Sequence, residues 1–139
     1  MLKTLSRSLL LAGLLGSALA LPAKAQVSGA LVVQAVGAGS TTGGAATLPA
    51  VATKTTFLCG FIATESATAG ATVAGSIVGL SGGNPNIYFG IGVTAMPIIT
   101  PVTFSPCLPA SGPNVTIIVN AAPPGVGGLN SIWAWGYQQ

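Results

Sequence analysis

Residues 87–94 read IYFGIGVT, and this stretch decides the fold class. Large apolar residues alternate with smaller or more polar ones, so that one face would carry Ile87, Phe89, Ile91 and Val93. Because successive side chains of a β-strand point to opposite faces, the alternation predicts a strand with one face against a core. The preceding cluster SGGNPN at residues 81–86 is rich in turn-forming residues and predicts the turn that leads into this strand.

Comparable alternation recurs on both sides of this strand. The segments that show it are residues 55–64, 71–80, 98–104, 114–121 and 131–138. Segment 98–104 contains Pro101, which cannot donate a hydrogen bond within a sheet, so we expect it at a sheet edge. Several short strands separated by turn signals, with few helix signals, predict an all-β fold: a single antiparallel β-sandwich of the Ig-like or jelly-roll-like kind.

The phase of the alternation also predicts which side chains face the core. On this basis the inward-facing residues include Val73, Ile77, Val115, Ile117 and Val119. The same reasoning places Phe57, Cys59 and Phe61 together on one face of the segment 55–64.

The part of the chain before residue 51 has weaker signals. Residues 27–36 (VSGALVVQAV) alternate loosely and are compatible with a strand. Residues 37–50 (GAGSTTGGAATLPA) are rich in Gly, Ala and Thr, which is typical of a flexible linker or long loop. We therefore expect an N-terminal strand and linker over residues 26–50 and the β-sandwich domain over residues 51–139.

The first 25 residues have the pattern of a cleavable secretory signal peptide. Lys3 and Arg7 precede an uncharged apolar run at residues 9–21, which is too short to cross a bilayer core as a membrane anchor would. Ala23-Lys24-Ala25 follows as an A-x-A cleavage signature, so the mature chain would begin at Gln26. Removing 25 of the 139 residues leaves 114, enough for one domain. The predicted location is secreted, periplasmic or at the cell surface.

The predicted mature chain is almost uncharged, because only Lys54 and Glu65 remain to carry side-chain charge. Nucleic-acid binding needs several Lys or Arg to neutralise phosphates, so we expect no nucleic-acid partner. We also expect no membrane span in the mature chain. A soluble domain usually has about a quarter of its residues charged. The exposed surface can therefore carry only these two charges, and such a near-neutral surface favours self-association.

The residue types needed for most enzyme mechanisms are missing. With no His, Asp or Arg after residue 25, the mature chain cannot form a Ser-His-Asp, Cys-His or zinc site. Glu65 lacks the second carboxylate that glycoside hydrolysis requires. A Ser or Thr nucleophile with Lys54 as base remains, but a solvated surface lysine is favoured because a catalytic lysine needs burial. We expect no enzyme, no cofactor and no metal site.

The two cysteines, Cys59 and Cys107, are predicted to form a disulfide. An exported chain meets an oxidising compartment, and an even number of cysteines is typical of disulfide pairing there. The closed loop of 49 residues would contribute roughly 4 kcal/mol to stability in the chain-entropy description. A metal site at this pair lacks the further ligands that zinc requires.

The C-terminal segment 131–138 contains an aromatic stripe. In a strand, Trp133, Trp135 and Tyr137 project from one face, and Ile132, Ala134 and Gly136 project from the other. Three interpretations remain open for the stripe. It fills the core with its polar tips at the edge, it stacks on sugar rings, or it packs against a neighbouring subunit, where Trp and Tyr are enriched.

Three short motifs carry a resemblance to known proteins. They are residues 57–61 (FLCGF), 104–110 (FSPCLPA) and 134–138 (AWGYQ). Together they resemble a loose group of small uncharacterised proteins from bacteria and their phages, over roughly residues 55–139. The resemblance implies no function, but it supports one module with its two cysteines paired.

A second resemblance is to chaperone–usher pilins, which are exported and have one disulfide, an incomplete sandwich and a terminal strand with an aromatic residue near the end. It implies that Tyr137 belongs to that strand and that residues 27–35 act as a donor strand by β-strand addition. Tyr137 departs from the pilin pattern, because it is third from the end and two tryptophans precede it.

The expected function is an exported, non-enzymatic structural or assembly module at the cell surface or in a particle. Its partners would be copies of itself or another surface protein. One alternative is a carbohydrate- or surface-binding module that uses the aromatic stripe, with a glycan as partner. A second alternative is a pilin-like fibre subunit.

Overall fold

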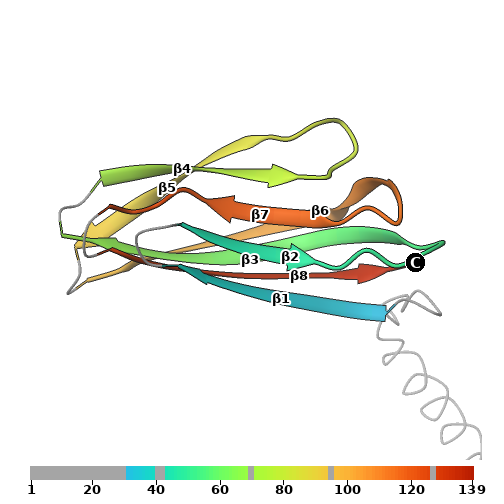
Figure 1. Ribbon diagram of the computed structural model, residues 1–139, viewed down its shortest axis with the longest axis horizontal. Helices are drawn as coiled ribbons and strands as arrows, with labels where there is room; N and C mark the ends of the chain where they lie inside the picture. Colours follow the sequence, from blue (N-terminus) through green and yellow to red (C-terminus); the bar gives the residue numbers. More distant parts are fainter. Residues whose placement is uncertain (1–30, 40–42, 69–70, 94–95, 126–127) are drawn as a thin grey trace, which may run out of the picture.

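The computed structural model describes residues 31–39, 43–68, 71–93, 96–125 and 128–139 (Figure 1). Eight strands are present: β1 (Leu31–Gly39), β2 (Gly44–Leu48), β3 (Thr55–Ala67), β4 (Ala71–Val78), β5 (Asn86–Val93), β6 (Ile98–Pro113), β7 (Ile117–Ala121) and β8 (Leu129–Gln138). The all-β prediction is confirmed. Nowhere in these ranges is there a helix with the length and apolar character needed to cross a membrane. The predicted signal peptide lies outside the described residues.

The strands form a single sheet that is nearly barrel-shaped. Its order is β1-β8-β3-β5-β4-β7-β2, and β6 pairs with the other side of β3. The pairings are antiparallel except for a short parallel one, in which Ser66 and Ala67 of β3 lie opposite Gly92 and Val93 of β5. The sandwich expected from the sequence would have two separate sheets, whereas this parallel pairing joins two halves. In Figure 1, β4 and β5 lie on one side of the molecule and β1 and β8 on the other.

The core lies between the two halves of the sheet. Phe61 on β3 and Phe89 on β5 meet edge to face there, with ring centroids 6.0 Å apart. Most of the predicted inward faces are confirmed, because the buried side chains include Val73, Ile77, Phe89, Ile91, Ile117 and Val119. Their burial follows directly from the alternation in the sequence, since β4, β5 and β7 each place every second residue against the other half. Val115 is half-buried, and the prediction was wrong for Val93, which is 43% exposed at the end of β5.

A bulge in β3 changes the predicted face of this strand. Leu58 lies opposite Gly136 and Gly60 lies opposite Trp135, so Cys59 is an extra residue relative to β8. Because one inserted residue reverses the alternation, Phe57 and Phe61 point to opposite faces. Phe61 is fully buried, whereas Phe57 is half-buried. The expectation that they share a face was therefore wrong.

The segment expected to be a linker contributes to the sheet. Gly44–Leu48 forms β2, which pairs with β7, and its Ala46 and Leu48 are fully buried. The small residues make this possible, because a Cβ atom on Gly37 of β1 would overlap the carbonyl oxygen of Ala45. Gly and Ala here allow close approach of two backbones rather than flexibility. The structure thus differs from the expected boundary at residue 51, since strands β1 and β2 belong to the same sheet as the rest.

Candidate functional site

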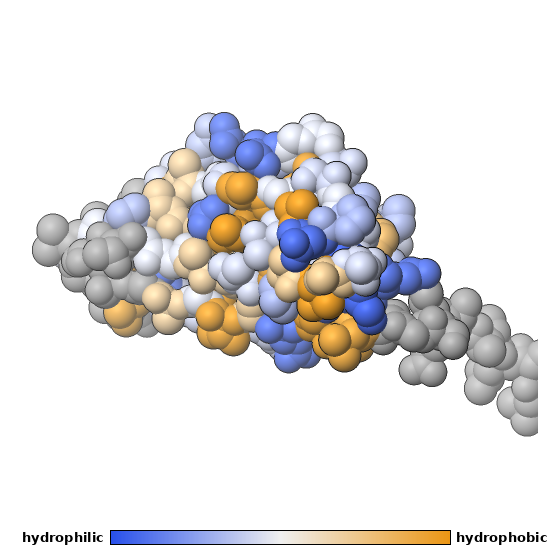
Figure 2. All heavy atoms as spheres, turned by 45° about the vertical axis from the view of Figure 1, so that its right-hand side comes forward, coloured by the Kyte–Doolittle hydropathy of each residue, from blue (hydrophilic) through white to orange (hydrophobic). Residues whose placement is uncertain are grey.

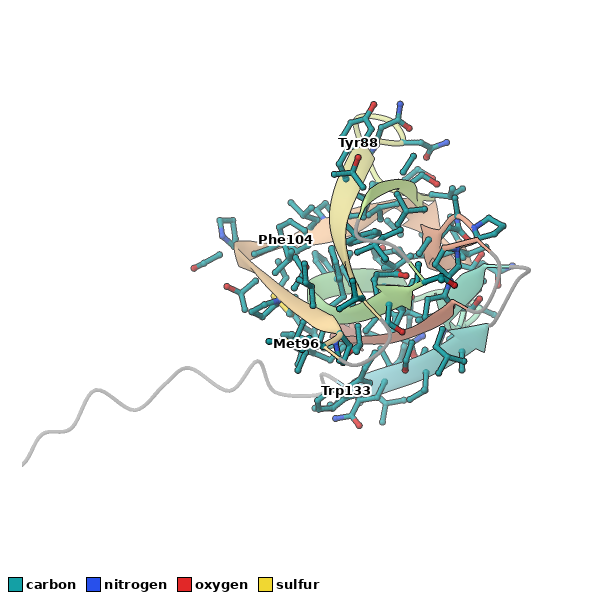
Figure 3. The ribbon with its side chains drawn as sticks, turned by 90° about the vertical axis from the view of Figure 1, so that its left-hand side faces the viewer. Tyr88, Met96, Phe104 and Trp133 are labelled. Carbon is teal, nitrogen blue, oxygen red and sulfur yellow. A yellow bond between two sulfur atoms is a disulfide. The ribbon has the colours of Figure 1, made fainter. Side chains whose placement is uncertain are left out.

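The aromatic stripe of β8 lies on the outer face of the sheet. Ile132 and Ala134 are fully buried on the core side, while Trp133 is 41% exposed. Trp135 and Tyr137 share the outer face with Trp133 and are half-buried. Figure 3 shows Trp133 at the margin of the molecule formed by β1 and β8. The structure therefore does not have the aromatic side chains in the core, which was one of the interpretations of the sequence.

A continuous apolar row crosses this outer face at Trp133. In the register of the sheet, Trp133 lies opposite Val36 of β1 and Ile62 of β3, and Ile62 lies opposite Pro101 of β6. Val36 is 72% exposed, so the row is open to solvent. These four residues come from four neighbouring strands and were not connected by the sequence pattern. Figure 2 shows one view of the surface, in which hydrophobic residues (orange) are interspersed with hydrophilic ones (blue).

Neighbours on the same face cover the other two aromatic residues. The rings of Tyr137 and Phe57 stack, with centroids 4.7 Å apart and an angle of 10° between their planes. Trp135 lies over Gly60, where a Cβ atom would be 2.9 Å from its Cε2 atom. Trp133 and Trp135 are 5.7 Å apart and tilted by 48°. Trp133 is therefore the aromatic residue of the stripe that is most available to a partner.

The predicted disulfide between Cys59 and Cys107 is confirmed, with Cα atoms 4.3 Å apart. It joins β3 to β6 at the bulge, where the register shifts from Leu58 opposite Leu108 to Gly60 opposite Thr103. Regular ladder pairing is lost over this stretch, so the covalent bond ties the two strands where their hydrogen bonding is interrupted.

The outer face carries no charged side chain among the described residues of β1, β3, β6 and β8. Glu65 is the one ionisable acid of these strands, and it is fully buried on the core side. Lys54 immediately precedes β3, and at about 3.3 Å per residue it lies roughly 35 Å from Glu65, too far for an ion pair. Of the two charged residues expected at the surface, only Lys54 remains there, because Glu65 lies on the same inward face of β3 as Phe61 and Ala63. The spacing of Glu65 from these two residues could have predicted its burial from the sequence.

Glu65 lies opposite Asn130 of β8, which is also buried. Neither side chain has a hydrogen-bond partner among the described residues. Burial of the Glu65 carboxyl removes water from it and raises its pKa to about 7. Sequence reasoning missed this buried polar pair, because it depends on which strand lies beside β3.

The opposite end of the interior holds a polar cluster with hydrogen bonds. Gln138 is fully buried, and its Nε2 donates to the carbonyl oxygen of Pro49 at 2.7 Å and to Oγ1 of Thr56 at 3.3 Å. Thr56 Oγ1 donates to the same Pro49 oxygen at 3.1 Å. These bonds fix the C-terminal end of β8 to the segment between β2 and β3.

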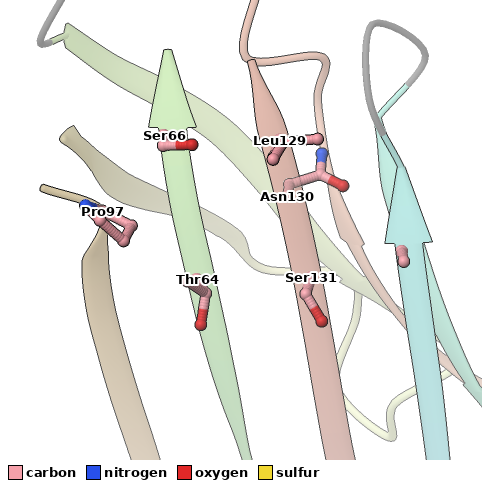
Figure 4. A pocket seen from close by; sticks show the side chains of 7 residues that line it. Thr64, Ser66, Pro97, Leu129, Asn130 and Ser131 are labelled. Carbon is pink, nitrogen blue, oxygen red and sulfur yellow. The ribbon is translucent and has the colours of Figure 1, made fainter. Parts of the chain in front are cut away.

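A pocket of about 380 Å³ opens near the end of the outer face where β3 and β8 lie side by side (Figure 4). Its lining residues are Ala38, Thr64, Ser66, Pro97, Leu129, Asn130 and Ser131. The lining offers hydroxyl and amide groups and no charged side chain, which suits hydrogen bonding to a neutral group. Within the described ranges, no three His, Cys, Asp or Glu residues come together as a metal site would require.

Comparison with protein-family models, with curated proteins and with solved structures finds no match to this chain. The architecture and the chemistry of the outer face are therefore the basis for a functional proposal.

Proposed function

We propose that the chain is an exported, non-enzymatic structural or assembly module that associates with copies of itself or with another surface protein. The observation that carries the proposal is the uncharged outer face of β1, β8, β3 and β6, with its row of Val36, Trp133, Ile62 and Pro101. Exposed apolar patches of this kind mark interaction surfaces in soluble proteins.

The chemistry of this face suits a protein partner. Trp and Tyr are enriched in interfaces, where charged residues are depleted from the centre. Trp133 is 41% exposed, and Val36, which lies opposite it on β1, is 72% exposed. Covering them with a second apolar surface would remove their contact with water. Because the outer face carries no charged side chain among the described residues, this chain would not have to desolvate a charge there.

The test is the oligomeric state of the mature chain, measured by sedimentation velocity at micromolar to millimolar concentration. Trp133→Ser should shift the protein toward monomer. Tyr88→Ser is the matched control, because Tyr88 is a 73% exposed aromatic residue on the other side of the molecule (Figure 3). A strictly monomeric wild-type chain, or equal effects of the two variants, would contradict assembly through this face.

The exposed Trp133 favours one alternative function, a carbohydrate-binding module. Trp rings stack on sugars, and the pocket lined by Thr64, Ser66 and Ser131 follows the same strands toward their ends. A glycan array with the mature chain tests this function. Binding that is lost in Trp133→Ala and kept in Tyr88→Ala would support it, and an array without signal would contradict it.

The pilin-like alternative is tied to residues 27–35 as a donor strand. The described part of this segment, residues 31–35, pairs with residues 134–138 of β8 in the same chain. A pilin-like fibre would require this strand to leave its own sheet for that of a neighbour.

A further inference from the structure

The outer edge of β1 is open for pairing. β1 pairs with β8 on one side, and among the described strands none pairs with its other side. β2 contacts β1 without forming a ladder with it: a Cβ atom on Gly37 would overlap the carbonyl oxygen of Ala45, so the β2 backbone packs against the inner face of β1 there. An open edge presents a row of backbone N–H and C=O groups that another strand can bind.

The other edges of the sheet differ from β1 in length or in composition. β6, at the opposite edge of the same half, contains Pro101, Pro106, Pro109 and Pro113, which cannot donate to an added strand. β2 has only five residues. β1 has nine residues, with no proline and no charge. Proteins commonly protect edges with prolines, charges or short strands, so β1 is an edge left available.

The chain itself offers little to cover this edge. If the mature protein begins at Gln26 as the cleavage signature predicts, five residues precede Leu31. A tight hairpin would use about two of them in its turn, which leaves three to pair with a nine-residue strand. The occupant of the edge is therefore best supplied by another chain, and a second copy brings an identical uncharged strand.

Building on the assembly function proposed above, we propose that two copies pair antiparallel through β1 about a two-fold axis. Directly opposite residues of an antiparallel pair lie on the same face of a sheet, so outward residues must meet outward residues. The register that pairs all nine residues places Ala35 at the axis, opposite Ala35 of the second copy. Gln34 then lies opposite Val36 of the second copy, and no like charges meet because the strand has none.

This pairing would extend the outer face across both copies. Val36 and Trp133 are neighbours in one row, and Gln34 and Trp135 are neighbours in the next. In the dimer, Val36 of one copy lies opposite Gln34 of the other. The row that contains Val36 and Trp133 in one copy therefore continues into the row that contains Gln34 and Trp135 in the other copy. The outer aromatic surface would be doubled in width.

The register is tested by cross-linking mature chains that carry one new cysteine each. Directly opposite Cβ atoms lie about 4.5–5.5 Å apart, whereas a diagonal offset of two residues gives roughly 7–8 Å, beyond the usual range of a disulfide. A mixture of Gln34→Cys and Val36→Cys chains should therefore give covalent dimers under mild oxidation. Neither variant alone should give covalent dimers. Thr72→Cys, exposed on β4 in the other half of the sheet, replaces Val36→Cys in the matched control mixture.

The outcomes separate this inference from the proposed function. Covalent dimers that require both variants support β1 pairing. Self-association of the wild-type chain without cross-linking in the mixture would overturn β1 pairing in this register while leaving the assembly function standing. A wild-type chain that stays monomeric would overturn both β1 pairing and self-assembly, and would leave another surface protein as the partner in the proposed function. Peptide mapping of the Cys59–Cys107 disulfide in each variant shows that the fold is retained.

Discussion

Glu65 and Asn130 lie directly opposite each other in the β3–β8 register, and both side chains are buried without a hydrogen-bond partner among the described residues. Burial raises the pKa of Glu65 from 4.5 to about 7. The folded chain therefore keeps a proton on Glu65 at pH values where the unfolded chain has released it. Because the folded state binds more protons between these two pKa values, its stability must fall as pH rises through that window.

The first prediction concerns this pH dependence. The free energy of unfolding should decrease by about 3 kcal/mol in total from below pH 4.5 to above pH 7. Glu65→Gln should remove the dependence and be the more stable protein above pH 7, since the amide carries no charge to desolvate. Urea unfolding of both proteins at the two ends of the window measures this. The same change in the free energy of unfolding with pH in the variant and the wild type would contradict the prediction.

Local alternation was enough to predict the strands that pack against the core. Segments 71–80, 87–94 and 114–121 bury most of the residues that were expected to face inward, because a strand with one face against the core and the other toward water sorts its side chains by face. The strand β2 was missed, since its sequence GAATL has no clear alternation of large apolar and polar residues. The parallel β3–β5 pairing joins distant segments and has no local signal.

The candidate site could be predicted only in part. The common face of Trp133, Trp135 and Tyr137 follows from the period of a strand. Which face of β8 is buried does not, because Ile132 and Ala134 are also apolar and compete for the core. The smaller side chains face inward, where Phe61 of β3 fills the interior. The β3 bulge at Cys59 was equally hidden, because residues 57–61 (FLCGF) contain no polar residue that would show a reversal of the alternation.

The second prediction concerns the disulfide. Replacing both Cys59 and Cys107 by alanine should lower the free energy of unfolding by roughly 4 kcal/mol, because the unfolded chain is no longer closed into a loop of 49 residues. Urea denaturation of the double variant and the oxidised wild type gives the difference. An unchanged denaturation midpoint would contradict the prediction.

The third prediction concerns the buried end of β8. Gln138→Ala removes the donor to the Pro49 carbonyl oxygen and to Thr56. We expect a loss of about 1–3 kcal/mol in the free energy of unfolding, because both hydrogen bonds and the packing of a fully buried side chain are lost, while Thr56 and Pro49 keep their bond to each other. Gln139→Ala is the control, since the side chain of Gln139 is exposed. Equal losses in the two variants would show that the buried hydrogen bonds are not the cause.

The fourth prediction concerns export. The exported protein should begin at Gln26, with a mass lowered further if that glutamine cyclises. Ala25→Arg should block processing, because the peptidase accepts small residues at this position. Intact-mass spectrometry of the exported fraction decides the matter. An exported form that retains Met1 would overturn the cleavage prediction.

The last prediction concerns the contact between Trp135 and Gly60, which shapes the outer face. The Trp135 ring occupies the space above Gly60, so a Cβ atom there would lie 2.9 Å from Cε2 of Trp135 and 2.5 Å from the carbonyl oxygen of Val102. Gly60→Ala must therefore move the indole or the β6 backbone, and we expect a loss of about 1–3 kcal/mol from this overpacking together with a shift in tryptophan emission. Gly112→Ala is the matched control, because a Cβ atom on Gly112 of β6 has no described atom within 4 Å. The displaced indole should also leave Trp133 less supported and weaken self-association in sedimentation velocity. Unchanged stability and emission in Gly60→Ala would show that Trp135 does not rest on this glycine in solution.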